Sequence, residues 1–127
     1  MTASQIVLYA IIALALLFYL RRYLQRRRMK EYSAAEVANL VTSNEVVLLD
    51  VRTQQERRQY CIQGSLHIPI DELPKKIAAL EKYRDKEIIC YCHSGSRSFI
   101  AVSILANNGF KAANMQGGMV EWNYLNL

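Results

Sequence analysis

The centre of the chain reads Ile88-Ile89-Cys90-Tyr91-Cys92-His93-Ser94-Gly95-Ser96-Arg97-Ser98. The first five of these residues form an apolar run, which is typical of a strand buried on both faces of a parallel sheet. Small and polar residues follow. The almost wholly apolar segment from Ser98 to Asn108 then predicts a helix that ends before Gly109. The stretch therefore predicts a strand, a short loop and a helix, with Cys92 at the carboxyl end of the strand.

The segments on either side continue this alternation. Residues 46–49 predict a second buried strand, and residues 111–115 predict a weaker third one. Helical spacing of apolar residues predicts helices over 34–41, around 73–80 and over 119–124. Strands separated by helices predict an α/β fold with an open, mostly parallel sheet flanked by helices.

A different pattern opens the chain. Residues 6–20 carry no charge, and residues 1–20 together are long enough to cross a bilayer as a helix. The alternative is a buried helix of a soluble protein, but an apolar run without a polar stripe would have to be surrounded by more protein than the remainder supplies. We therefore predict one transmembrane helix over 1–20, followed by a basic juxtamembrane linker over 21–30 and a domain over 31–127.

Charge is concentrated beside this apolar run. The net charge of +5 comes from 16 Lys and Arg against 11 Asp and Glu, and six of the cations lie within residues 21–30. The remainder is nearly neutral, which argues against a nucleic-acid-binding domain. Cations after the apolar run, with none before it, also argue against a cleaved signal peptide. By the positive-inside rule they predict a single-pass membrane protein whose domain faces the cytoplasm.

The three cysteines do not suggest a disulfide framework, and a reducing compartment suits them better. Backbone N–H groups of the loop after Cys92, the start of the following helix and the charge of Arg97 should lower the pKa of the Cys92 thiol. Cys92 is therefore the candidate nucleophile. We expect Cys90 in the core, with a resolving or sulfur-relay role left open, and Cys61 in packing. The spacing of Cys90, Cys92 and His93 does not fit a zinc site.

Cys92 to Arg97 resembles the six-residue active-site loop of the rhodanese family of sulfurtransferases. Three further stretches resemble that family in the same order: Asp50-Val51-Arg52 with Glu56, Gly64-Ser65-Leu66-His67-Ile68-Pro69, and Gly117-Gly118 with Trp122. The resemblance implies that Cys92 takes a sulfane sulfur as a persulfide and passes it on, without a metal or organic cofactor. It also implies that the rest of the loop binds the substrate, namely His93, Ser94, Gly95, Ser96 and Arg97.

The chain departs from the family pattern at residues 60–63 and at Met119. Because neither departure falls within the loop sequence, we expect them to affect local packing more than activity.

Several other side chains receive predicted supporting roles. We expect Asp50, at the end of a strand, to hydrogen-bond loop groups near Cys92. Arg52 and Glu56 are four residues apart and predict an ion pair across a short helix. The guanidinium fork of Arg97 is predicted to bind an anion. We expect the His93 side chain to point outward into solvent.

The predicted function is sulfur transfer from a donor such as thiosulfate to a thiol or cyanide at the membrane surface, with a membrane or thiol protein as a further potential partner. One alternative is a non-catalytic, membrane-tethered module that binds a persulfide or senses redox state through Cys92. A more distant alternative is a phosphatase or arsenate reductase. Phosphatases of this fold place five residues between their cysteine and arginine, whereas only four separate Cys92 from Arg97.

Overall fold

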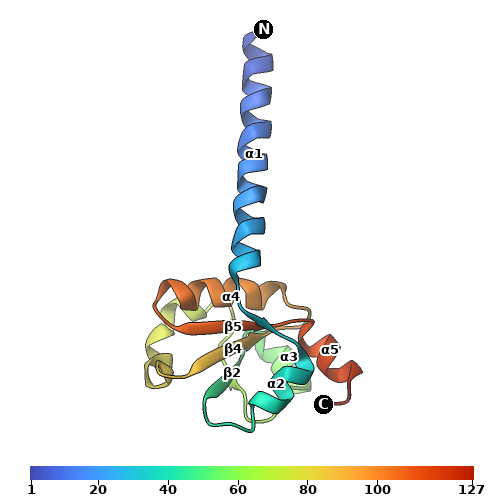
Figure 1. Ribbon diagram of the computed structural model, residues 1–127, viewed down its shortest axis with the longest axis vertical. Helices are drawn as coiled ribbons and strands as arrows, with labels where there is room; N and C mark the ends of the chain where they lie inside the picture. The colour runs from blue at the N-terminus through green and yellow to red at the C-terminus, as the bar shows by residue number, and fades with distance from the viewer.

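The computed structural model describes all residues, 1–127, as one long helix that leads into an α/β domain (Figure 1). Helix α1, Ala3–Arg28, begins with a capping box between Thr2 and Gln5 and buries none of its residues. It is the one helix long and apolar enough to cross a membrane, by length and composition. Most of the basic segment 21–30 continues this helix.

The sheet has five parallel strands in the order β1-β5-β4-β2-β3. These are β1 (Glu31–Tyr32), β2 (Val46–Asp50), β3 (Leu66–His67), β4 (Glu87–Tyr91) and β5 (Lys111–Met115). Strand β4 lies in the middle of the sheet and pairs with both β2 and β5. The predicted open parallel α/β sheet is confirmed, and its central strand is the one that delivers Cys92.

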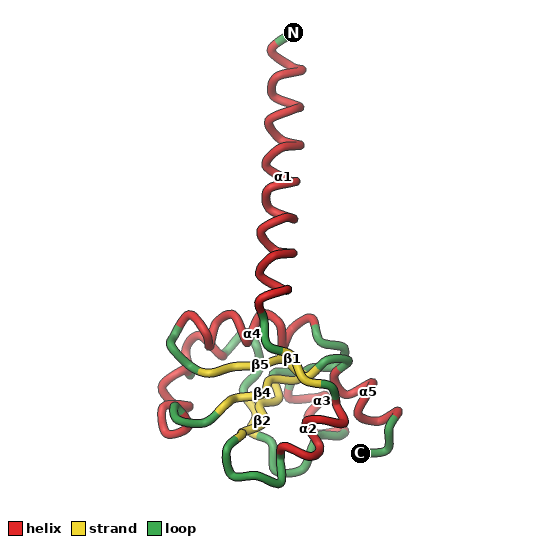
Figure 2. Tube along the Cα trace, in the orientation of Figure 1, coloured by secondary structure: helices red, strands yellow, loops and turns green.

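Helices cover both faces of the sheet (Figure 2). They are α2 (Ala34–Leu40), α4 (Ser96–Asn107) and α5 (Gly118–Tyr124), whereas α3 (Gln54–Gln59) buries none of its residues. Alternate residues of β4 enter two separate core clusters. Ile88, Cys90 and Cys92 pack with residues of α4, while Ile89 and Tyr91 pack with residues of α2 and α5. Burial on both faces explains why this strand is apolar throughout.

Three elements differ from the sequence prediction. The expected helix around residues 73–80 is instead two 3-10 segments, Leu73–Lys75 and Ile77–Tyr83. Pro74 lies in the first turn of the first segment and has no N–H to donate, and the two segments meet at Lys76. Strands β1 and β3 were not predicted, because two residues are too few to show a periodic pattern.

The end of α1 is fastened to the domain at several points. The side chain of Met29 packs against the core cluster that contains Cys92. The carbonyl of Lys30 accepts a hydrogen bond from the Asn114 N–H, and its ammonium lies 3.0 Å from the Glu87 carboxylate. The guanidinium of Arg26 lies 5.0 Å from the centre of the Phe99 ring on α4. Contacts with the domain therefore begin within α1, ahead of the predicted boundary at residue 31.

Candidate active site

The Cys92 thiol lies directly after β4, fully buried beneath the loop that leads into α4. Its Sγ accepts a hydrogen bond from the Gly95 N–H at 3.0 Å and lies 3.4 Å from the Ser98 hydroxyl. Gly95 has a φ of +112°, a conformation that favours glycine, and this turn aims its N–H back at the sulfur. Helix α4 begins at Ser96, two residues earlier than predicted.

Two opposing effects set the pKa of the Cys92 thiol. Burial raises the pKa. Hydrogen bonds from the Ser98 hydroxyl and from the backbone N–H groups of Ser98, Gly95 and Ser94 lower the pKa, and together they outweigh the effect of burial, so the net shift is downward. Hydrogen bonds to a thiolate favour the charged form. We expected a lowered pKa from the loop amides and Arg97. In the structure the largest lowering effects come from the Ser98 hydroxyl and the amides, and the charge of Arg97 also interacts with Cys92.

Arg97 forms an ion pair with Glu56, which we had not predicted. Its two terminal nitrogens donate to the two carboxylate oxygens of Glu56, at 2.6 and 2.9 Å. These hydrogen bonds lower the pKa of Glu56 to about 2, against the opposing effect of burial. The fork predicted to bind an anion is therefore occupied by a carboxylate, which leaves the loop N–H groups as the donors nearest the sulfur.

The expected ion pair between Arg52 and Glu56 is wrong. Arg52 precedes Thr53, the N-cap of α3, so it is outside the helix and cannot reach Glu56 by helical spacing. Its guanidinium instead folds back onto the buried carboxylate of Asp50, with both contacts at 2.9 Å. Glu56 closes the capping box with Thr53 and remains free to receive Arg97.

The expectation for Asp50 also needs correction. Its carboxylate is fully buried and accepts hydrogen bonds from Arg52 and Arg57, not from the loop after Cys92. Arg52 in turn donates to the Tyr60 carbonyl. Asp50 and Arg52 therefore fix the two ends of α3. This helix carries Glu56, the residue that pairs with Arg97 of the loop.

Helix α5 holds the loop from the other side. The N–H groups of Met119 and Val120 donate to the carbonyls of Cys92 and His93, at 2.9 and 3.1 Å. The approach is so close that a Cβ on Gly118 would overlap these carbonyls. We expected Met119 to affect local packing more than activity. Its N–H in fact contacts the loop backbone, a consequence of chain reversal at the paired glycines.

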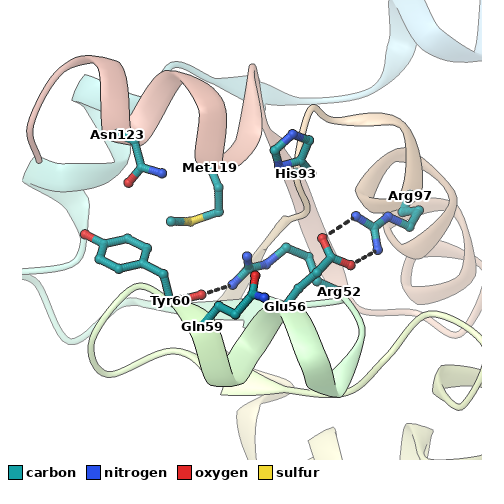
Figure 3. A pocket seen from close by; sticks show the side chains of 8 residues that line it. All are labelled: Arg52, Glu56, Gln59, Tyr60, His93, Arg97, Met119 and Asn123. Carbon is teal, nitrogen blue, oxygen red and sulfur yellow. Dashed lines mark hydrogen bonds and ion pairs between the residues drawn. The ribbon is translucent and has the colours of Figure 1, made fainter.

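A pocket of about 400 Å³ opens beside the loop (Figure 3). It is lined by Arg52, Glu56, Gln59, Tyr60, His93, Arg97, Met119 and Asn123. His93 is exposed at its rim, as expected. Both departures from the family pattern, at Tyr60 and Met119, contribute side chains to this pocket, so these positions shape the surroundings of the loop and not only the packing.

Two polar residues near the sulfur were not predicted to be part of the site. The hydroxyl of buried Ser98 lies 2.6 Å from the side-chain oxygen of buried Asn114 and 3.4 Å from the Cys92 Sγ, and its single proton can be donated to either acceptor. Asn114 is the polar residue inside the otherwise apolar interior of β5, and a buried polar side chain needs a partner. This polar residue in an apolar strand is the feature of the sequence from which a buried hydrogen bond near the site could have been predicted. No three His, Cys, Asp or Glu side chains gather as a metal site.

The other cysteines occupy different surroundings. Cys90 is fully buried in the same core cluster as Cys92, as predicted from its position in the strand. Burial and the neighbouring Cys92 raise the pKa of the Cys90 thiol. Cys61 is partly exposed after α3. All three are free thiols, and only Cys92 receives hydrogen bonds from loop amides.

The fold and the site together define an open parallel α/β domain whose central strand places a buried thiol of lowered pKa beneath a tight loop. Within this class of domains, the chain belongs to the rhodanese family: the model of the rhodanese-like domain matches residues 33–124. The match covers strands β2 to β5, the loop and α5, and it begins after β1.

Relatives place sulfur transfer at the level of this family. The Bacillus subtilis protein named "Putative sulfurtransferase YtwF" is 36% identical over 95 residues, which are 74% of this chain and 90% of that protein. A rhodanese-related protein of Thermoplasma volcanium has a similar structure, with a TM-score of 0.70, 32% identity, and coverage of 76% of this chain and 92% of that one. The tRNA uridine(34) hydroxylase of Cronobacter sakazakii is 33% identical over 94 residues, which are 70% of this chain and only 27% of the enzyme.

Proposed function

We propose that the protein is a sulfurtransferase that carries sulfane sulfur on Cys92. The observation that supports this most directly is the thiol of Cys92, which accepts the Gly95 N–H at 3.0 Å and has a lowered pKa. A thiolate is the form that attacks sulfur. The names of the relatives support the same reaction class.

With thiosulfate as donor, the Cys92 thiolate attacks the outer sulfur, the sulfur–sulfur bond of thiosulfate breaks, and sulfite leaves with the bonding electron pair. The persulfide on Cys92 carries a negative charge on its outer sulfur, and the N–H groups of Ser94, Gly95 and Ser98 stabilise negative charge at this place. Cyanide or a thiolate then attacks the outer sulfur and restores the Cys92 thiolate. Each step is a substitution at sulfur and needs no external oxidant or reductant.

The site also bears on the other two functions considered. A loop with four residues between Cys92 and Arg97 is narrower than the phosphatase loop, and the Arg97 fork is occupied by Glu56. A redox-sensing module would use the same thiolate but would not turn over. Thiocyanate production from thiosulfate and cyanide separates an enzyme from a sensor, and hydrolysis of an aryl phosphate that depends on Cys92 would support a phosphatase instead.

The deciding experiment is mass spectrometry of the purified full chain after incubation with thiosulfate. We expect an adduct of one sulfur atom on the peptide that contains Cys92, removed by cyanide with release of thiocyanate. An adduct on Cys61 or Cys90 instead, or no adduct together with no thiocyanate, would contradict the proposal. Inserting one glycine after Ser94 should widen the loop and impair loading.

We also propose that α1 anchors the protein with its domain on the cytoplasmic side. The support is the uncharged apolar run of residues 6–20 in α1, with six cations in the following segment 21–30 and no Lys or Arg before the run. Two single-cysteine proteins test this, Thr2→Cys and Asn44→Cys, each with the three native cysteines replaced by alanine. A membrane-impermeant thiol reagent should label Thr2→Cys in intact cells and Asn44→Cys only after lysis. The reverse pattern would invert the topology.

A further inference from the structure

A second pocket, of about 460 Å³, lies against the loop and is built partly by the end of α1. Its lining combines residues of the loop, of the start of α4, of β5 and its following turn, of β1, and of α1: Arg26, Glu31, Ser94, Gly95, Ser96, Phe99, Asn114, Gln116 and Gly117. Figures 1 and 2 show why these segments meet: α1 ends over α4, and the chain then enters β1 at the sheet edge beside β5. Arg26 and Glu31 precede the region that matches the rhodanese family.

The pocket contains one cation and one anion that do not neutralise each other. Arg26 and Glu31 have no ion-pair partner within 4.0 Å, in contrast to Arg52, Arg84 and Arg97. Both side chains are exposed, and the segments that carry them are held in place. The Arg26 guanidinium lies 5.0 Å from the centre of the Phe99 ring, and the backbone of Glu31 pairs with Asn114 in the parallel register of β1 and β5.

Two residues of this lining also connect to the reactive sulfur. Gly95 donates its N–H to the Cys92 Sγ at 3.0 Å. The Asn114 side-chain oxygen lies 2.6 Å from the Ser98 hydroxyl, which lies 3.4 Å from the same sulfur. A ligand seated between Arg26 and Glu31 would therefore be next to the groups that surround a persulfide on Cys92.

We infer that this pocket binds the sulfur acceptor and that the acceptor is a small thiol of the α-amino-acid type. Its carboxylate would pair with the Arg26 guanidinium and its ammonium with the Glu31 carboxylate. A simple anion would meet the repulsion of Glu31, and a simple amine that of Arg26, whereas a zwitterion satisfies both. The inference rests on the proposed function and adds the chemical class of the acceptor to it.

The transfer step is balanced without a further reactant. The acceptor thiolate attacks the outer sulfur of the Cys92 persulfide and forms a new sulfur–sulfur bond. The bond between that outer sulfur and the Cys92 Sγ breaks, and its electron pair returns to Sγ as a thiolate. The products are the persulfide of the amino-acid thiol and the free enzyme, with no net oxidation.

The experiment compares four acceptors on the full chain in detergent, with thiosulfate as donor. L-cysteine carries both an ammonium and a carboxylate, and cysteamine carries the ammonium alone. The third acceptor, 3-mercaptopropionate, carries the carboxylate alone, and 2-mercaptoethanol carries neither charge. Each kcat/KM is divided by the value for 2-mercaptoethanol in the same protein, and each variant's ratio is compared with that of the wild type. The comparison with the wild type cancels overall activity and the intrinsic reactivity of each thiol.

Arg26→Gln should reduce the ratio for L-cysteine and for 3-mercaptopropionate, on the order of tenfold for a lost charge-assisted contact, and leave that for cysteamine unreduced. Glu31→Gln should reduce the ratio for L-cysteine and cysteamine only. Arg26→Lys should recover part of the L-cysteine preference. The matched control is Arg27→Gln, because Arg27 faces the Tyr23 ring instead of the pocket.

Equal ratios in the wild type and both variants would overturn the inference. Effects of Arg27→Gln as large as those of Arg26→Gln would also overturn it, because they would indicate a general influence of the basic segment. Thiocyanate formation from cyanide by the wild type tests the underlying sulfur transfer separately. Turnover with cyanide but no dependence on the charges of the thiol would reject the acceptor site and keep the sulfurtransferase.

Discussion

Cys90 and Cys92 are two positions apart, and their side chains point to the same face of the sheet. Both are fully buried in the same core cluster. Burial raises the pKa of the Cys90 thiol, whereas the pKa of the Cys92 thiol is lowered. The difference lies in what each sulfur faces. Cys90 is inside β4, where the backbone N–H groups are used by the sheet, and Cys92 is at the start of a loop whose N–H groups are free to point inward.

The loop, and not exposure, therefore distinguishes the thiol whose pKa is lowered from the thiol whose pKa is raised. A buried thiol surrounded by apolar atoms keeps its proton. The same thiol with an N–H group at 3.0 Å and a hydroxyl at 3.4 Å favours the thiolate. Whatever displaces these donors should move Cys92 toward the behaviour of Cys90.

Replacing the two sulfurs in turn tests the comparison most severely. Cys92→Ser should lower thiocyanate formation on the order of a thousandfold or more, because a hydroxyl is a far weaker nucleophile toward sulfur than a thiolate. Cys90→Ala should retain activity within about twofold and lower stability, since it removes a buried side chain. Kinetics and thermal unfolding measure both. An inactive but folded Cys90→Ala would mean that the two thiols act together.

Gly118→Ala should have the next largest effect, because it presses on the loop backbone. A Cβ at this position would lie 2.6 Å from the His93 carbonyl oxygen and closer still to that of Cys92, and the φ of +55° is also unfavourable for alanine. We expect a loss of about 2 kcal/mol or more of unfolding free energy and a reduced rate of sulfur transfer.

Gly64→Ala is the matched control for Gly118→Ala. Gly64 has a φ of +84°, but a Cβ there would meet nothing within 4 Å. It should cost about 1 kcal/mol, the strain of the backbone alone, and leave the rate unchanged. If both variants behaved alike in denaturation and kinetics, contact between α5 and the loop would not matter for the site.

The hydroxyl beside the sulfur should have a smaller effect. Ser98→Ala removes one of the groups that lower the pKa of the Cys92 thiol, so that pKa should rise. The loss of one hydrogen bond to a charged sulfur predicts a decrease in sulfur loading on the order of tenfold near neutral pH. Ultraviolet absorbance of the thiolate as a function of pH measures the shift. A pKa that stays the same in Ser98→Ala would assign the whole effect to the loop amides.

Much of the fold and the position of the candidate nucleophile could be predicted from the sequence. Strand β4 and helix α4 carry strong local signals, since an apolar run ends in small residues and Gly109 follows the helix. The resemblance to the rhodanese family placed Cys92 and its loop. These features depend on neighbours in sequence or on a matching motif.

The partners of charged residues could not be predicted, because they depend on how distant segments pack. Arg97 and Glu56 are 41 positions apart and meet only when α3 and the loop are in place. The expected pair of Arg52 and Glu56 relied on helical spacing, but Arg52 lies outside the helix. The approach of Arg26 to the loop depends in the same way on the docking of α1 against Phe99.

The smallest effect we predict concerns the ion pair between Glu56 and Arg97, which steadies the end of the loop without touching the sulfur. The hydrogen bonds from Arg97 lower the pKa of Glu56 to about 2, from a reference value of 4.5. A carboxyl group whose pKa is lowered on folding stabilises the native state above its unfolded pKa. That contribution is lost as the pH falls from 4.5 toward 2.

Glu56→Gln removes this titration, so its deficit in unfolding free energy should be largest at neutral pH and should shrink as the solution becomes acidic. Because both side chains are about one-third exposed, the deficit should be modest. Urea denaturation of the wild type and the variant at about pH 6 and about pH 3 measures the change. Glu45→Gln is the control, since it removes an exposed carboxylate that has no ion-pair partner. A deficit that stayed constant with pH would mean that Glu56 supports the site through the N-cap of α3 and not through its charge on Arg97.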